Sequence, residues 1–162
     1  MEIKLEEFRK QSQALKDQNK QFLSRLKKVN PRKLDSDFHD AHANAFDRID
    51  CLNCANCCKT TSPIFKQKDI ENVAKHIRMS PSQFIEKYLH LDKDNDYVLN
   101  TAPCPFLDAE NYCLVYESRP TACREYPHTD RKKMYQLLDL TYKNTLVCPA
   151  VLDIVEQLKK VK

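Results

Sequence analysis

The run Cys51-x2-Cys54-x2-Cys57-Cys58 is the feature that most restricts how this 162-residue chain can fold. Two-residue spacers let a turn direct successive thiolates to one ion or cluster, and the same C-x2-C-x2-C run occurs in bacterial ferredoxins. Because Cys57 and Cys58 are adjacent, we expect their side chains to diverge and to serve two sites or one multinuclear centre. Four more cysteines follow, at positions 104, 113, 123 and 148.

Metal binding explains eight cysteines better than the alternatives do. The start MEIKLEEFRK has no apolar signal region, and no apolar run reaches the roughly 18 residues of a membrane span. We therefore expect a cytoplasmic protein without a membrane partner, in a compartment that keeps thiols reduced. A disulfide framework would need an oxidising compartment, and inert buried cysteines would account for only one or two. Four thiolates suit zinc, and the spacing equally suits an iron–sulfur cluster, so the spacing does not decide which metal is bound.

Two of the later cysteines are expected to ionise easily. Cys148 precedes Pro149 and is the expected N-cap of the last helix, and Cys123 lies between Arg119 and Arg124 in the first turn of a short helix. Helix N-termini and neighbouring cations stabilise a thiolate and lower its pKa. Holding eight thiolates together without a metal would be very costly.

Glycine is absent from the chain, which excludes whole classes of enzyme. Rossmann folds, P-loops, kinase glycine loops and G-x-S-x-G hydrolases all need glycine at fixed positions. A catalytic Cys–His pair is not favoured either, because His128 is the only histidine near the later cysteines and no acidic residue can be assigned to orient it. We expect His39 and His42 to be ordinary surface or packing residues.

Positive charge is concentrated at the N-terminus. Residues 1–34 hold ten Lys/Arg and four Asp/Glu, whereas residues 35–162 hold 17 and 19. A basic helix can contact nucleic acid or an acidic partner. However, the chain has no nucleic-acid motif and no basic stripe interleaved with aromatic residues, so nucleic acid is not an expected partner and a solvated helix face is favoured.

The same N-terminal segment carries a heptad pattern that predicts one long amphipathic helix over residues 1–29. Its seam positions, seven of nine apolar, are Met1, Leu5, Phe8, Ser12, Leu15, Asn19, Phe22, Leu26 and Val29. Asn19 falls where a polar residue can fix the register of a coiled coil. The seam could bind a protein partner or a second copy of the chain, or it could pack on the protein's own body, which we favour.

Local signals predict several shorter elements. The clearest is a capping box, in which Ser80 is the N-cap, Pro81 the first helical residue and Gln83 the third. The predicted helices cover residues 35–49, 68–78 and 81–90, a short stretch after Pro120, and the segment that begins at Pro149.

Short strands are predicted at Tyr97–Asn100 and Tyr112–Tyr116. Residues 105–107 are expected to pair with Tyr112–Leu114, so that Cys113 lies opposite Phe106 and is a diagonal neighbour of Cys104.

These elements define a mainly α fold with a small β-hairpin, of the irregular α+β type. We expect two parts: an N-terminal amphipathic helix over 1–34, and a compact, metal-stabilised cysteine-cluster domain over 35–162.

The cysteine pattern resembles the YkgJ-type cysteine-cluster family, the CxxCxxCC zinc- or iron-chelating domain. The matching segments are CLNCANCC at 51–58, CPFLDAENYCLVYESRPTACREYP at 104–127 and CPA at 148–150, with DIENVAKHIRMSPSQFIEKYL at 69–89 resembling the family's helical spacer. The resemblance covers roughly residues 51–150. One departure is Ala55, where relatives often have glycine.

The resemblance implies a bacterial intracellular protein that binds zinc or iron, including iron in an iron–sulfur cluster. The metal ligands it implies are Cys51, Cys54, Cys57, Cys58, Cys104, Cys113, Cys123 and Cys148. Tyr116, Arg119, Pro120, Arg124 and Pro127 match the second motif and would support the site. The domain also resembles part of flagellin lysine methylases.

Three functions therefore compete. The favoured one is a metal-binding protein whose metal organises the fold. The others are a cluster-dependent enzyme, either a redox protein or one like a lysine methylase, and an interaction protein with a purely structural metal.

Overall fold

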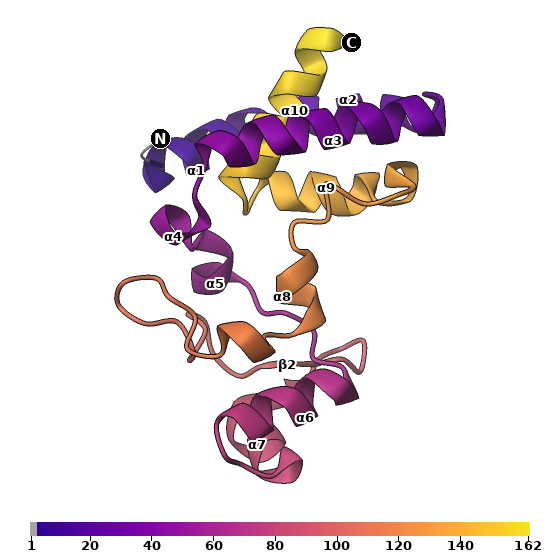
Figure 1. Cartoon of the computed structure of the whole chain (residues 1–162). Helices are drawn as coiled ribbons and strands as arrows, with labels where there is room; N and C mark the ends of the chain where they lie inside the picture. The colour runs from indigo at the N-terminus through magenta and orange to yellow at the C-terminus, as the bar shows by residue number, and fades with distance from the viewer. Residues whose placement is uncertain (1–2) are drawn as a thin grey trace. The chain divides into compact units, whose positions relative to one another are not determined.

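The computed structural model describes residues 3–162, most of which lie in helices (Figure 1). Contacts divide the chain into two units. Unit 1 comprises the N-terminal part up to Cys54 together with Pro127–Lys162, and unit 2 comprises Ala55–Tyr126. In this division the N-terminal helices group with the C-terminal ones, and the expected domain boundary after residue 34 stays a prediction. The mainly α fold with one small antiparallel hairpin is confirmed.

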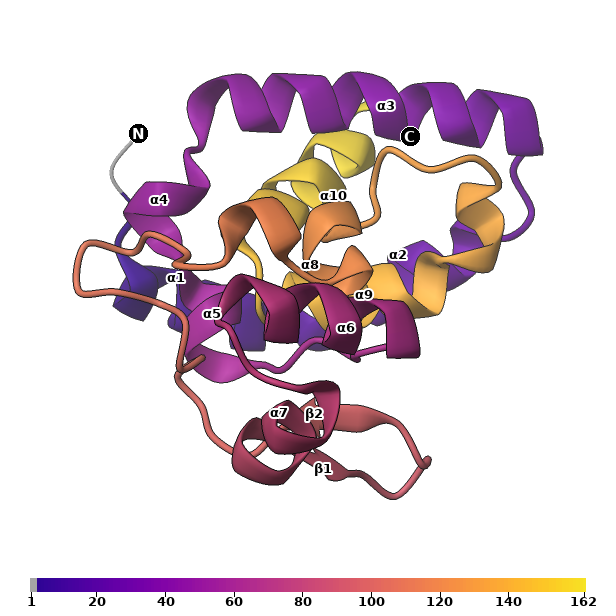
Figure 2. The ribbon, with the colours of Figure 1, turned by 60° about the horizontal axis from the view of Figure 1, so that its bottom comes forward.

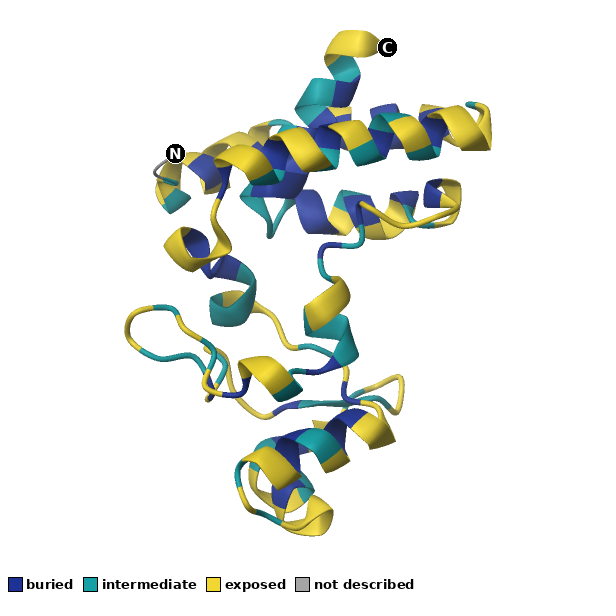
Figure 3. Ribbon diagram, viewed as in Figure 1, coloured by how far each residue is buried: buried dark blue, intermediate teal, exposed yellow. Residues whose placement is uncertain are grey.

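Unit 1 is a layered group of helices around one apolar core. Helix α10 packs on α3 and α9, and α9 packs on α2 (Figures 1 and 2). In Figure 3 the exposed and buried residues of α3 fall on different sides of the helix, as expected for a helix with one face in a core. The elements are α1 (Leu5–Ala14), α2 (Lys16–Leu26), α3 (Pro31–Arg48), α4 (Cys51–Cys54), the 3-10 helix η2 (Met134–Gln136), α9 (Leu138–Thr145) and α10 (Pro149–Val161).

The predicted single N-terminal helix is wrong in one respect, because it is two helices. Leu15, with φ −91° and ψ 0°, separates α1 from α2. Met1 lies outside the described residues. The apolar seam packs within unit 1, since Phe22 and Leu26 belong to its core. Asn19 is fully buried and its side-chain amide makes no hydrogen bond to the described residues, so the seam packs on the protein's own body, as favoured.

Helix α3 begins four residues earlier than predicted. The Asn30 side chain accepts hydrogen bonds from the backbone N–H groups of Arg32 and Lys33, at 3.0 and 3.2 Å. Pro31 then occupies the first helical position, where its missing N–H costs nothing. Helix α2 has already ended at Leu26, so the Asn-Pro pair acts as the start signal of α3, which leads toward Cys51.

Unit 2 has its own apolar core, which helices α6 and α7 and the two strands surround. The core contains Phe65, Ile70, Phe84, Phe106 and Val115 among others, with the Phe84 and Phe106 rings stacked at 6.1 Å. The elements are α5 (Asn56–Thr60), α6 (Gln67–His76), α7 (Pro81–Tyr88), β1 (Leu89–Leu91), β2 (Tyr97–Leu99), the 3-10 helix η1 (Tyr116–Ser118) and α8 (Thr121–Glu125).

The capping box of α7 is confirmed, but the end of the helix differs from the prediction. Ser80 Oγ accepts from Gln83 N–H at 3.2 Å, and the Gln83 side chain accepts from Ser80 N–H at 3.0 Å. The helix ends at Tyr88, and Leu89 starts strand β1 instead of continuing it. Strand β1 pairs antiparallel with β2, with Leu89 opposite Leu99. The partner of the predicted strand at Tyr97 is thus β1, which begins inside the segment 81–90 that was predicted as a helix.

The second predicted strand pair is reduced to one isolated bridge. Leu107, not Phe106, lies opposite Cys113. The prediction was one residue out of register, and the strand expected to reach Tyr116 gives way to η1. Asp108 forms the turn, since its side chain accepts from the N–H groups of Glu110 and Tyr112.

No helix among residues 3–162 is both long enough and apolar enough to cross a membrane.

Candidate metal centre

The eight cysteines fall into two groups, one in each unit. None of them, all within the described part of the chain, forms a disulfide. Unit 1 holds Cys51, Cys54 and Cys148, and unit 2 holds Cys57, Cys58, Cys104, Cys113 and Cys123. The contiguous cysteine run is thus divided after its second member.

Ala55 begins the unit 2 part of the run. Its backbone is left-handed, with φ 47° and ψ 20°, and it directly precedes α5. Helix α5 carries Cys57 and Cys58, whose sulfur atoms are 4.0 Å apart. The expectation that these side chains diverge is therefore wrong. Two thiolates on one tetrahedral zinc ion, with Zn–S bonds of about 2.3 Å, would lie about 3.8 Å apart, so the adjacent thiols approach ligand spacing.

The left-handed backbone at position 55 explains why glycine suits this position, and it leads to a prediction. Ala55→Gly relieves about 1–2 kcal/mol of left-handed strain, which offsets the lost methyl burial and the greater freedom of the unfolded chain. We expect a change in the free energy of unfolding below about 0.5 kcal/mol. Ala74→Gly, at a fully buried position in α6, should cost about 2 kcal/mol.

Urea denaturation of both variants checks this prediction. Equal losses of stability at positions 55 and 74 would mean that the conformation at Ala55 is not strained.

Two more thiols of unit 2 lie on the loop that follows α7 and the β1–β2 hairpin. The backbone N–H of Cys104 donates to the carbonyl of Cys58 at 2.8 Å, which ties the loop to α5. Cys113 lies on the returning segment, bridged to Leu107. Both cysteines pack against the unit 2 core. This loop therefore brings Cys104 and Cys113, which are distant in the sequence, next to the cysteine run.

Cys123 is carried by α8, and a buried aspartate fixes the start of that helix. Asp69, only 3% exposed, accepts hydrogen bonds from both the backbone N–H and the hydroxyl of Thr121, each at 3.1 Å. Its other oxygen accepts from the N–H of Lys66 at 2.9 Å. Sequence reasoning missed Asp69. Its place in the first turn of α6 suggests a local cap, and only the fold reveals its second partner.

Electrostatics link the unit 2 thiols to one another. The hydrogen bond from Cys57 lowers the pKa of Cys58 to about 7, opposed by burial and helped by Lys59. Burial, followed by the charges of Cys58, Cys104 and Cys113, raises the pKa of Cys123 to about 12.

Cys104 and Cys113 behave in the same direction. Burial raises the pKa of each thiol, and the charge of Cys58 raises both further. Cys58 is thus the common neighbour of the other four thiols of unit 2.

The expectation that Cys123 and Cys148 ionise easily is wrong. Burial raises the pKa of Cys148 to about 12, and the charges of Cys51 and Cys54 add to this effect. Cys148 is indeed the N-cap of α10, although its side chain makes no capping hydrogen bond. The backbone N–H groups of Val151 and Ala150 lower its pKa, but by less than burial raises it. At Cys123, Arg119 acts in the lowering direction and is likewise outweighed by burial.

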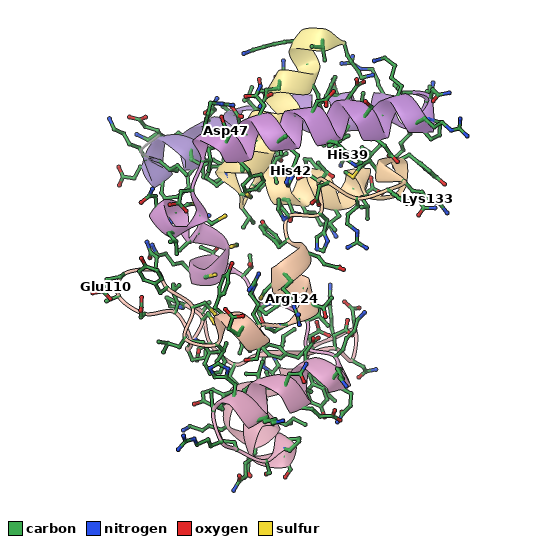
Figure 4. The ribbon with its side chains drawn as sticks, in the orientation of Figure 1. His39, His42, Asp47, Glu110, Arg124 and Lys133 are labelled. Carbon is green, nitrogen blue, oxygen red and sulfur yellow. The ribbon has the colours of Figure 1, made fainter. Side chains whose placement is uncertain are left out.

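The second motif supplies structure around these thiols. The Arg119 guanidinium lies 3.8 Å from the centre of the Tyr116 ring and donates to the Tyr116 carbonyl at 2.7 Å. Arg119 thereby stabilises the turn at Tyr116, which lies between Cys113 and Cys123 in the chain. Arg124 lies on α8, beside Cys123 in the chain (Figure 4).

The histidines of α3 make packing contacts within unit 1. His42 Nδ1 hydrogen-bonds to the hydroxyl of the buried Thr129 at 2.8 Å, and His39 Nε2 to the carbonyl of Arg131 at 2.9 Å. Figure 4 labels both on α3. Burial lowers the pKa of His42. These contacts agree with the expectation that both residues are ordinary packing histidines.

Within residues 3–162, no three His, Cys, Asp or Glu side chains are already arranged so that they could hold a metal ion. The thiols of unit 2 thus lie near one another without forming a coordination shell. Their chemistry suits zinc and iron, which thiolates bind in sites of this kind.

The fold and the thiols define a mainly helical, cysteine-rich domain of the metal-binding type. A family model confirms this class. It matches residues 50–148, and the chain belongs to the CxxCxxCC family, whose description reads "Putative zinc- or iron-chelating domain". Comparisons with curated proteins and with solved structures give no match.

Proposed function

We propose that this chain is a cytoplasmic metal-binding protein that chelates zinc or iron through cysteine thiolates. The observation that carries the proposal is the group formed by Cys58, Cys104, Cys113 and Cys123. These residues come from three separate segments of unit 2 and influence one another's charge. Four thiolates are a complete ligand set for a structural zinc ion or an iron–sulfur cluster.

The energetics of the thiols support the same function. Several partly buried thiolates at close range would repel one another, and each would lose hydration. A bound cation compensates both costs, so the raised pKa values are those expected of ligands without their metal. Thiols that form no disulfide also suit a reducing compartment such as the cytoplasm.

Elemental analysis of protein purified without oxygen, with an absorption spectrum of the same sample, tests the proposal. We expect zinc or iron bound in stoichiometric amounts. Zinc with a colourless spectrum assigns a structural or storage site. Iron with sulfide and a brown chromophore that dithionite bleaches assigns an iron–sulfur cluster able to carry electrons. Metal-free protein would overturn the proposal.

The raised thiol pKa values predict a steep dependence of metal affinity on pH. Cys104 and Cys113 have pKa values raised above the ordinary 9, and that of Cys123 is about 12. These three thiols are protonated near pH 7.5, so metal binding must displace their protons. Because each proton released gives a tenfold change per pH unit, affinity should rise on the order of 1,000-fold per unit.

Competition with a chelator between pH 7 and 8 measures this slope. Cys123→Ser removes one of the displaced protons and should reduce the slope to about 100-fold per unit. An affinity independent of pH would contradict the assignment of these thiols as ligands.

A further inference from the structure

Unit 1 contains a cavity of about 500 Å³ that residues of α2 and α10, and residues just after these helices, line. Pockets that bind small molecules usually measure about 300–1,000 Å³, so the cavity is large enough for such a ligand. None of the described residues that line it is a cysteine. The cavity is therefore separate from the candidate metal centre, and the proposed function does not use it.

One part of the cavity wall is apolar. It is formed by Phe22, Leu26 and Val29. Phe22 and Leu26 belong to the core of unit 1 and are only 5% and 2% exposed, and Val29 packs against that core. Because so little of these side chains reaches solvent, a flat partner surface could not contact them. A narrow hydrocarbon group that enters the cavity could, and its burial would be favourable.

The charged side chains of the cavity wall are all cations, at least among residues 3–162, where they are Arg25, Lys159 and Lys162. Arg25 is exposed and makes no ion pair with the described residues. Its guanidinium lies 6.0 Å from the centre of the Phe22 ring. The cavity therefore places an uncompensated positive charge directly beside its apolar wall.

The two lysines are held in position by neighbouring side chains. Lys159 Nζ donates to Gln18 Oε1 at 2.9 Å and to Glu156 Oε1 at 2.6 Å, and Lys162 Nζ lies 2.9 Å from Asp37 Oδ2. An ammonium group has three donors. These bonds use two of them at Lys159 and one at Lys162, so each lysine can also donate to a ligand. Side chains held in this way lose little freedom when a ligand binds.

We infer that this cavity binds a small amphipathic carboxylate, a molecule of the fatty-acid type with one carboxylate and a short apolar chain. The chain lies against Phe22 and Leu26, and the carboxylate accepts from Arg25 and from the two lysines. A guanidinium fork matches both oxygens of a carboxylate, and bonds between ionised partners are the stronger ones. A ligand with only one of its two parts would satisfy only one side of the cavity.

Calorimetric titration of the full chain, purified without oxygen and with its metal, tests the inference with three probes. Octanoate has both parts of the ligand, octanol has only the chain, and acetate has only the carboxylate. We expect octanoate to bind at one site per chain, and octanol and acetate to bind at least about tenfold more weakly. Added salt should weaken the binding of octanoate and leave that of octanol unchanged.

Two variants locate the site. Arg25→Gln should weaken octanoate binding about tenfold or more without changing the binding of octanol, because only the contact with the carboxylate is lost. Lys20→Gln is the matched control. It removes an exposed positive charge from the same helix at a position that does not line the cavity, and it should change the affinity for octanoate less than about twofold.

Three outcomes overturn the inference. The first is the absence of saturable octanoate binding, including the case in which polyglutamate binds instead, which would indicate a surface for an acidic protein. The second is acetate binding as tightly as octanoate. The third is an equal loss of octanoate affinity in Arg25→Gln and Lys20→Gln, which would mean that the cavity is not the site. Metal content is measured on the same samples, and its absence would contradict the proposed function without affecting this inference.

Discussion

Chelation of the metal is expected to release residues 104–125 while α6 and α7 stay folded. This segment has little regular structure, since it consists of one isolated bridge, the 3-10 turn η1 and the five-residue helix α8. Such short helices are not stable on their own. If Cys104, Cys113 and Cys123 share a metal, the metal cross-links these pieces, and its binding free energy becomes folding free energy.

Hydrogen exchange measures this release residue by residue. The N–H of Leu114, which donates to Phe106 at 2.8 Å, is the best reporter. Structural zinc sites contribute on the order of 10 kcal/mol, so exchange should accelerate on the order of 1,000-fold or more. Amides in the middle of α6 are the internal control, because Ile70 and Val73 are fully buried in an apolar core. Unchanged protection at Leu114 would contradict the cross-link.

Asp69→Asn is expected to have the second largest effect. The buried carboxylate accepts three hydrogen bonds, from Lys66 and twice from Thr121. An amide turns one acceptor into a donor that faces an N–H group. Hydrogen bonds to a charged group contribute about 1.5–3 kcal/mol, and a buried donor left unpaired adds to the loss. We expect unit 2 to lose about 2–4 kcal/mol of stability.

The same substitution should also weaken metal binding, because Thr121 is the first residue of the helix that carries Cys123. Asp92→Asn is the matched control. A single oxygen of Asp92 accepts from the N–H groups of Asp94 and Asp96, and asparagine keeps that oxygen, so the cost should stay below about 1 kcal/mol. Chemical denaturation and metal competition are measured on both variants. Equal metal affinities in the two would exclude Asp69 as a positioning residue for Cys123.

The elements that the sequence predicts most accurately are those whose signals are local. The capping box at Ser80 and the proline after Cys148 each act within one helical turn, and both helices start where predicted. The errors arose where a distant partner decides. Leu89 continues the helical pattern, yet it starts strand β1 and pairs with Leu99 of β2, ten residues further along the chain. Likewise, Leu107 lies opposite Cys113 in a segment whose Phe106 ring stacks on Phe84, a residue distant in the sequence.

The candidate site shows the same limit. Spacing identifies the eight cysteines, but it gives no basis for sorting them, because the partners of Cys58 are 46 to 65 residues away in the chain. Helix position alone also misjudges the pKa of Cys148, since burial raises this pKa by more than the backbone N–H groups at the helix start lower it.

The absence of glycine affects the unfolded ensemble of this chain as well as its native turns. Among residues 3–162, six positions have positive φ, from Ala55 to Lys133, and none is glycine. A chain without glycine has fewer backbone conformations to lose on folding, which offsets the strain held at these six turns. Part of its stability therefore lies outside the native contacts. A glycine introduced at an exposed site of negative φ would weaken the protein without removing a single interaction.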